Sequence, residues 1–374
     1  MRVLIVCDFF LKYASAQIEA LSDAGLAVAL LCRTHAGEFG GDKRERRELL
    51  DRVGAAGACV FEVPGRFRSL SAVPSLLPIR QHVHRWEPDL VHAHDNYDPR
   101  LLLLTRGFPL ALTIHDPTPH PGAHALVGLR MRTREAWIRR ASELVVHGDR
   151  LRDALLAVGG ARRIAVVSHG ATVLSVPLPI PEEPAVLFFG RLEAYKGLSV
   201  LVSAMHIVWQ GRPDVRLIVA GAGPEAHRLP ADPRIELHDS YIPEADVDAL
   251  FARASLAVLP YTEASQSGAG LEALRRGVPI VVSNVGSLPD LIHDSSLVVA
   301  PGDPAALASA LSRCLDHDAE FRRAVLANTR ERFSWPATVA PTLDVYKRVL
   351  KDSGQGTEST NDAGHSRTRV RSST

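Results

Sequence analysis

The stretch FFGRLEAYKG, residues 188–197, places two cations around a short turn. Arg191 follows an apolar run that ends at Gly190, and Lys196 comes five residues later. The planar guanidinium of an arginine can hold two oxygens of one anion, and a lysine adds a point charge. The pair is therefore a candidate anion site, although solvated loop charges would give the same pattern.

A second candidate anion site lies in LPYTEASQSGAGLEALRRGVP, residues 259–279, where a strand pattern leads through a polar turn into a glycine-rich helix start. Backbone N–H groups around Gln266, Ser267 and Gly268 would have no partner within the helix, and the helix dipole adds positive potential. Glu272 shares that helix face and can accept hydrogen bonds from sugar hydroxyls. The alternative for Glu272 is favourable placement near the dipole alone. The two sites together predict a ligand with both phosphates and hydroxyls.

Two further motifs are weaker evidence for a binding site. GAGP, residues 221–224, contains Gly223 but is only a fragment of a dinucleotide fingerprint, so it predicts a tight turn. DVD, residues 246–248, falls inside a helical pattern that puts its carboxylates on different faces. We read them as solvated surface charges and expect no required metal.

The elements around these residues are short apolar runs that alternate with amphipathic helical patterns. Continuous apolar strands indicate parallel sheets covered on both sides, so we expect two consecutive Rossmann-like, doubly wound α/β domains that face a central cleft. The expected divisions are an N-terminal domain over 1–172, a proline-rich linker over 173–184 and a second domain over 185–334. A helix over 335–350 is expected to pack back onto the first domain, and the polar tail 351–374 to be disordered. Ligands bind beyond the carboxyl ends of such strands.

Composition narrows the class of protein. The 374 residues are 46% hydrophobic with a net charge of +1, so neither a nucleic acid nor another polyanion is an expected partner. The four cysteines are scattered and indicate a reducing compartment. The opening MRVLIVCDFF is too short an apolar run for a secretory signal, and no stretch has the length of a membrane span. A cytoplasmic protein is expected.

Residues 186–292 resemble the donor-binding domain of retaining glycosyltransferases with the GT-B fold, in glycosyltransferase family 4 (glycosyl transferases group 1). The motifs that carry this are FGRLEAYKG, VRLIVAGAGP and LAVLPY…SQSG…LEAL, followed by GVPIVVSNVGSLPDLI. The resemblance implies that Arg191 and Lys196 neutralise the diphosphate of a UDP- or GDP-linked sugar and that Glu272 binds the ribose. Ala264 stands where the family usually has a second acidic residue.

The first half is similar to the acceptor domain of that family in WEPDLVHAHD and LALTIHDPTPHPG. His115, followed by Asp116 directly after a strand, would by resemblance contact the transferring sugar. His94 and His120 are weaker candidates that local hydrogen bonding explains equally well. Gly170, in VVSHG, is expected at the cleft. The glycine pair usual after the first strand is replaced by CDFFLKYASAQIEAL, with Lys12 and Tyr13 in the loop.

The resemblance implies a hexosyl transfer in which the acceptor hydroxyl attacks from the side that the diphosphate leaves, and a phosphate oxygen takes the proton. Glycans, glycolipids and cell-envelope polysaccharides are the expected acceptors. A sugar-nucleotide epimerase shares the architecture, and a non-catalytic nucleotide-sugar binding protein is a second alternative because of Ala264. The incomplete glycine fingerprint disfavours an NAD oxidoreductase.

A basic segment, GLRMRTREAWIRRA over 128–141, combines several cations with one large aromatic residue. Such a helix can lie on an anionic membrane, where lipid-linked acceptors are found. The alternative is a solvated helix face with one buried side. The residues concerned are Arg130, Arg132, Arg134, Arg139, Arg140 and Trp137.

Overall fold

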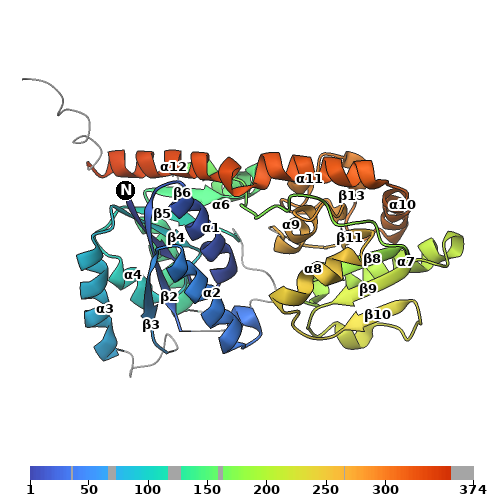
Figure 1. Ribbon diagram of the computed structural model, residues 1–374, viewed down its shortest axis with the longest axis horizontal. Coiled ribbons are helices and arrows are strands. Elements are labelled where there is room, and N and C mark those ends of the chain that lie inside the picture. The colour runs from blue at the N-terminus through green and yellow to red at the C-terminus, as the bar shows by residue number, and fades with distance from the viewer. Residues whose placement is uncertain (35–36, 66–72, 117–127, 159–162, 265, 355–374) are drawn as a thin grey trace, which may run out of the picture.

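The computed structural model describes residues 1–34, 37–65, 73–116, 128–158, 163–264 and 266–354. His120 and most of the tail expected to be disordered therefore lie outside the described residues. Two α/β domains lie next to each other (Figure 1). The first contains a seven-stranded sheet in the order β3-β2-β1-β4-β5-β6-β7, and the second a six-stranded sheet in the order β10-β9-β8-β11-β12-β13. The predicted pair of doubly wound domains is confirmed.

The first sheet is parallel throughout its registered pairs. Its strands are β1 (Arg2–Val6), β2 (Ala27–Arg33), β3 (Cys59–Val63), β4 (Leu90–His94), β5 (Leu110–Thr113), β6 (Glu143–Val146) and β7 (Ile164–Val166). Its helices are α1 (Leu11–Asp23), α2 (Lys43–Ala55), α3 (Val73–Trp86), α4 (Pro99–Leu104), α5 (Leu129–Arg140) and α6 (Asp149–Val158), with a short 3-10 turn, η1 (Gly37–Phe39).

The second sheet is parallel in the same way. Its strands are β8 (Ala185–Phe189), β9 (Arg216–Ala220), β10 (Ile235–His238), β11 (Leu256–Leu259), β12 (Ile280–Ser283) and β13 (Val298–Val299). Its helices are α7 (Leu198–Gly211), α8 (Glu244–Ala252), α9 (Gly268–Leu274), α10 (Pro304–Leu315) and α11 (Ala319–Phe333), and the 3-10 turn η3 (Ala194–Lys196) precedes α7.

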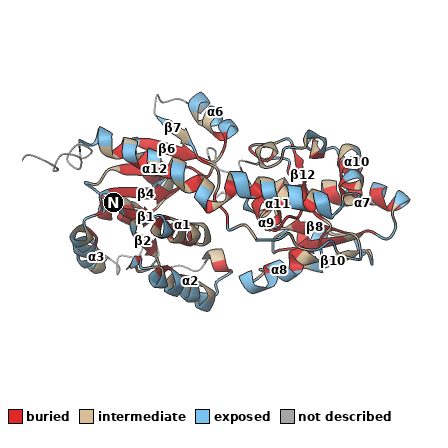
Figure 2. Cartoon of the chain, turned by 45° about the horizontal axis from the view of Figure 1, so that its top comes forward, coloured by how far each residue is buried: buried red, intermediate tan, exposed pale blue. Residues whose placement is uncertain are grey.

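The central strands of both sheets bury both faces, as their continuous apolar runs require, whereas the edge strands β3, β7 and β10 are only partly buried. On β1, Val3 and Ile5 join the cluster that contains α1, whereas Leu4 and Val6 join the cluster that contains Trp137 of α5. Figure 2 shows the central strands buried and the outward faces of α2 and α3 exposed. None of the helices in the described ranges combines the length and apolar character that crossing a bilayer needs.

The C-terminal helix α12 (Trp335–Asp352) returns to the first domain after α11 has packed on the second (Figure 1). Val345 and Val349 belong to the same apolar cluster as β1. Tyr346 places its hydroxyl 2.7 Å from Nδ1 of His92, and Arg348 pairs with Glu143 at 2.6 Å. The chain therefore crosses between the domains twice, once at residues 171–184 and once before α12.

Candidate functional site

The backbones of the loops after β8 and β9 approach each other closely at glycine residues. Gly221 has φ +144°, and a Cβ atom there would lie 2.0 Å from the carbonyl oxygen of Gly190. Gly223 likewise approaches the carbonyl of Leu192, where a Cβ would lie at 2.4 Å. Only glycines allow the two backbones to meet this closely. The turn that carries Arg191 is therefore fixed by the turn expected in GAGP.

Lys196 and Arg191 differ in their surroundings. Lys196 ends η3 with only 9% of its surface exposed, and its Nζ donates to the hydroxyl of Tyr261 at 3.2 Å. No carboxylate pairs with Lys196 within the described part of the chain. Arg191 is 67% exposed on its side chain and donates to the Tyr195 hydroxyl at 3.2 Å. A buried cation held only by a neutral phenol is favourable for binding an anion, because burial disfavours an unpaired charge.

Tyr261, which the sequence did not single out, connects the two predicted anion sites. Its hydroxyl lies 3.1 Å from Oγ of Ser267, the N-cap residue of α9. The Ser267 side chain makes no capping hydrogen bond, and α9 starts at Gly268, as predicted. Lys196, Tyr261 and Ser267 thus form one continuous polar row along the ends of β8 and β11.

Glu272 is less open than its predicted role suggests. One of its oxygens, Oε2, accepts from Arg275 at 2.7 Å and from Arg276 at 2.5 Å. Its other oxygen, Oε1, has no hydrogen-bond partner among the described residues, so it is the atom left for a ligand. Arg276 is fully buried and also pairs with Asp248 at 2.5 Å. Asp248, read from the sequence as a solvated charge, is 60% exposed but has this structural partner.

The position of the family's second acidic residue is occupied by a hydrophobic contact. Ala264 is partly buried and packs against the core of the second domain. The neighbouring Glu263 is exposed. Glu263 therefore does not supply the carboxylate that the family usually has at the position of Ala264.

Across from the anion site, four strands of the first sheet each lead into a histidine. His94 ends β4, and His115, His147 and His169 follow β5, β6 and β7. Because these strands are parallel neighbours, their carboxyl ends meet at one edge of the sheet. The ring of Tyr13, from the first turn of α1, lies among them, 4.3 Å from His169 and 5.8 Å from His115 between centroids. The sequence indicated only His94 and His115, although the same strand-end rule applies to the other two.

His115 takes part in a hydrogen-bonded row that crosses between the domains. Its Nδ1 lies 3.1 Å from the amide nitrogen of Gln266, its Nε2 lies 3.2 Å from Nδ1 of His94, and His94 Nε2 lies 2.8 Å from the amide oxygen of Gln17. An amide nitrogen donates and an amide oxygen accepts, so each ring carries its proton on Nε2. Burial lowers the pKa of both histidines well below the ordinary value. His115 therefore presents a neutral ring with its lone pair toward the second domain.

Asp95 holds the loop of His115 and Asp116. Its carboxylate accepts the backbone N–H groups of both residues at 3.3 Å and pairs with Arg134 of α5 at 2.8 Å. Arg134 also donates to the Asp116 carbonyl. The sequence did not reveal this role, because Asp95 and Arg134 are 39 positions apart.

The buried contacts of α5 favour the second interpretation of the basic segment, a solvated helix face with one buried side. Arg134 is paired with Asp95, Trp137 is fully buried, and Arg140 donates to the carbonyls of Thr105 and Phe108. These residues fasten the helix to its own domain. A membrane contact through the aromatic residue and these two arginines is therefore not supported.

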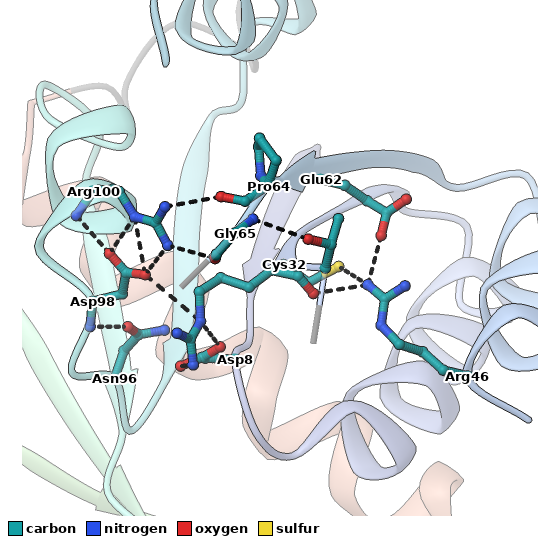
Figure 3. A network of polar contacts seen from close by, with 11 residues as sticks. Asp8, Cys32, Arg46, Glu62, Pro64, Gly65, Asn96, Asp98 and Arg100 are labelled. Atoms are coloured by element: carbon teal, nitrogen blue, oxygen red, sulfur yellow. Dashed lines mark hydrogen bonds and ion pairs between the residues drawn. The ribbon is translucent and has the colours of Figure 1, made fainter. Parts of the chain in front are cut away.

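Several other charged side chains at the ends of β1 to β4 pair with each other (Figure 3). Asp98 is 1% exposed and binds Arg100 at 2.7 Å, and Arg100 donates to the Pro64 carbonyl at 2.9 Å. Arg33, at the end of β2, pairs with Asp8. This network positions the loops after β1 to β4 and leaves the histidine side of the edge to face the second domain.

Further contacts join the domains beside the site. Lys12 places its Nζ 2.9 Å from the hydroxyl of Tyr241, 3.0 Å from Glu45 and 3.1 Å from Glu244. Tyr241 and Glu244 belong to the second domain. Lys12 and Tyr13, expected in a loop, lie instead in the first turn of α1, so this turn joins the two domains on one side of the site. Gly170 lies at the crossing, where a Cβ would fall 2.3 Å from the ring of Trp335.

Glu38 of η1 caps the first turn of α1. It accepts the N–H of Leu11 at 2.6 Å and that of Lys12 at 3.2 Å. Burial nevertheless raises its pKa from 4.5 to about 7, more than these two bonds lower it. Ionisation of this carboxyl group therefore costs free energy in the folded protein, next to the first turn of α1.

Replacing Glu38 with glutamine is expected to flatten the pH dependence of stability. Because the folded-state pKa lies above the unfolded value, the wild type binds an extra proton when folded. This group's contribution is complete below pH 4.5 and is lost as the pH rises through 7, by about 1–3 kcal/mol. Denaturant unfolding of the wild type and of the variant at pH 5 and pH 8 measures how much the free energy of unfolding of each protein changes with pH. Equal losses in Glu38→Gln and wild type would show that this carboxyl does not titrate as described.

Two known protein families match consecutive parts of the chain. Residues 12–173 match the family described as Glycosyltransferase Family 4, and residues 183–317 match Glycosyl transferases group 1. Glycogen synthase of Mycobacterium tuberculosis is 28% identical over 70% of this chain and 69% of its own length. D-inositol 3-phosphate glycosyltransferase of a Nocardioides species is 27% identical over 92% of this chain and 81% of its own.

Solved structures share the two-domain fold. Sucrose-phosphate synthase from Thermosynechococcus elongatus has a TM-score of 0.70 at 19% identity, over 94% of this chain and all of its own. Anabaena HepE in complex with UDP-glucose has a TM-score of 0.65 at 17% identity, over 95% of this chain and 99% of its own. The predicted GT-B fold is confirmed.

Proposed function

Since the chain belongs to the glycosyltransferases, with its two halves matching family 4 and group 1, we propose that it transfers a sugar from a nucleoside diphosphate sugar to an acceptor hydroxyl with retention of configuration. The observation that carries this proposal is Lys196. Within the described ranges its buried ammonium bonds to a phenol hydroxyl and pairs with no carboxylate, and the guanidinium of Arg191, five residues earlier, is exposed to solvent and lies 3.8 Å from Glu193. Together they offer two positive charges to one diphosphate.

In the proposed reaction the diphosphate is the leaving group, and stabilising its charge is the main work of the site. Lys196 and Arg191 take up the charge that develops as the bond from the anomeric carbon to the phosphate oxygen breaks. The acceptor hydroxyl forms the new bond on the same side of the sugar, and its proton passes to the departing phosphate oxygen. His115, from the opposite domain, would contact and orient the sugar.

We propose a UDP-linked donor, with a GDP-linked donor as the alternative. HepE, which shares the fold, is known in complex with UDP and glucose and with UDP-glucose. Oε1 of Glu272 is the acceptor available for a ribose hydroxyl. The two cations supply the charge neutralisation that a metal ion gives other transferases, so transfer would require no metal.

The proposed acceptor is a glycan, a glycolipid or a growing cell-envelope polysaccharide. The curated relatives carry names for both polymer and small-molecule acceptors, a glycogen synthase and an inositol phosphate glycosyltransferase. A sugar-nucleotide epimerase of the same architecture predicts a changed donor without any acceptor. Incubation with the donor alone therefore separates the two functions.

A panel of UDP-, GDP- and ADP-sugars should identify the donor through its effect on thermal stability. A ligand that binds only the folded protein raises Tm, by about 3 °C or more at a concentration near 100 times Kd. We expect UDP-sugars to give the largest shift, with and without EDTA. Proton NMR of the anomeric signal in the product then reports retention or inversion. No shift with any nucleotide sugar, or an inverted product, would contradict the proposal.

A further inference from the structure

Three imidazoles at the edge of the first sheet face one another. One ring nitrogen from each of His115, His147 and His169 lies within 4.8 Å of the others. The ring centroids of His147 and His169 are 4.9 Å apart, and those of His115 and His147 are 5.0 Å apart. Three nitrogen donors are thereby gathered around a single point.

Backbone carbonyls fix how two of these rings are protonated. Nδ1 of His147 lies 2.9 Å from the carbonyl oxygen of Val167, and Nδ1 of His169 lies 3.1 Å from that of Gly170. A carbonyl only accepts, so each Nδ1 carries the proton and each Nε2 keeps a lone pair. Histidines that bind metal ions are held in this way, with the second ring N–H donated to a carbonyl or carboxylate.

The lone pair on Nε2 of His147 accepts no hydrogen bond from the described residues. Its Nε2 is buried and has no hydrogen-bond partner among the described residues. Burial lowers the pKa of His147 to about 4 and that of His169 to about 3, so both rings are neutral near pH 7. A buried acceptor without a donor is costly, and a ligand at Nε2 would remove that cost.

The space next to these nitrogens is small, and its lining combines polar side chains with the apolar Leu271, Leu291 and Phe333. His147 and His169 line a cavity of about 30 Å³ together with Ser287 and Asp290 of the second domain. Oγ of Ser287 and Oδ2 of Asp290 are also buried and lack a partner among the described residues. A cavity of this volume holds an ion or a water molecule but not a sugar ring, and Asp290 adds a carboxylate to the available ligands.

We propose that His115, His147 and His169 bind one Zn²⁺ ion, with water or Asp290 as the fourth ligand. Imidazole nitrogens suit zinc, and bonds of about 2.1 Å in a tetrahedron place the nitrogens about 3.4 Å apart. The rings must therefore draw together from their present spacing, and His115 must release Gln266 from its Nδ1. The ion itself would take no part in the transfer reaction, which is proposed to need no metal.

Zinc at this point has a consequence that rests on the proposed function. His115 is the residue proposed to contact the transferring sugar, so a bound ion would exclude that sugar. Zinc is then an inhibitor of transfer, and a chelator restores activity instead of removing it.

Equilibrium dialysis of the full-length protein, stripped with a chelator and then exposed to Zn²⁺, tests the site directly. Wild type should retain one equivalent, and His147→Gln and His169→Gln should each lower the affinity at least 10-fold. His206→Gln is the matched control, because His206 also bonds a backbone carbonyl through Nδ1 but lies exposed on α7. The control should bind like wild type.

A second measurement on the wild type does not depend on the folding of any variant. Co²⁺ in place of zinc should give the intense visible absorption of a tetrahedral nitrogen-ligated ion. The weak spectrum of the hydrated ion, or equal zinc retention in wild type and a His147→Gln/His169→Gln double variant, would overturn the proposal. Nucleotide-sugar shifts in Tm are measured separately, so failure of the metal site leaves the proposed transfer untouched and the reverse also holds.

Discussion

Replacing Lys196 with alanine is expected to lower kcat/KM for sugar transfer by about 10²- to 10³-fold, the usual effect of losing one charge-stabilising group. The buried ammonium has no carboxylate partner in the described part of the chain, so its charge is available to the leaving diphosphate. Arg191→Ala should also lower transfer heavily. The measurement is initial transfer rate against donor concentration, in EDTA.

Lys196→Met separates charge from packing. Methionine has nearly the same length and fills the space beside Gly190 and Tyr261 without a charge, so its loss of transfer should match that of Lys196→Ala. Lys347→Ala, which removes an exposed lysine paired with Asp344 on α12, should leave the rate unchanged. Near-normal turnover in Lys196→Met, with circular dichroism showing a folded protein, would refute the assigned role.

The strand-end rule explains why much of the site was visible in the sequence. Lys196, Ser267 and His115 each follow an apolar run. Parallel strands bring such positions to the same edge within each sheet, Lys196 and Ser267 in the second sheet and His115 in the first. His147 and His169 follow apolar runs as well and could have been found in the same way. The pairing of Glu272 with Arg275 and Arg276 was also readable, since these residues stand three and four positions apart on one helix.

Other parts of the site depend on contacts that no local pattern contains. Lys12 meets Tyr241 across 229 positions, and Asp95 meets Arg134 across 39. Counting the arginines of α5 left a membrane surface and a solvated helix face both open, because charge is visible in a sequence and the partner of each charge is not. Likewise, the row from Lys196 through Tyr261 to Ser267 exists only once β8 and β11 pair.

His115→Ala is expected to lower kcat for transfer by about 10²-fold, the size of effect that a misplaced reacting group produces. The residue lies on the first domain, whereas the proposed diphosphate and ribose contacts all lie on the second. The affinity for free UDP should therefore stay within about twofold of wild type. The readouts are single-turnover transfer and UDP binding by calorimetry, both in EDTA so that no metal contributes.

A conservative variant distinguishes the loss of a polar contact that orients the sugar from the loss of side-chain volume. His115→Asn keeps a polar group that can meet Gln266, so it should recover part of the rate that alanine loses. His206→Ala, on the exposed face of α7, should behave as wild type. Unchanged transfer in His115→Ala would remove this residue from the reaction. An equal loss of UDP affinity would instead show that His115 acts by holding the two domains together through Gln266, since the proposed nucleotide contacts all lie on the second domain.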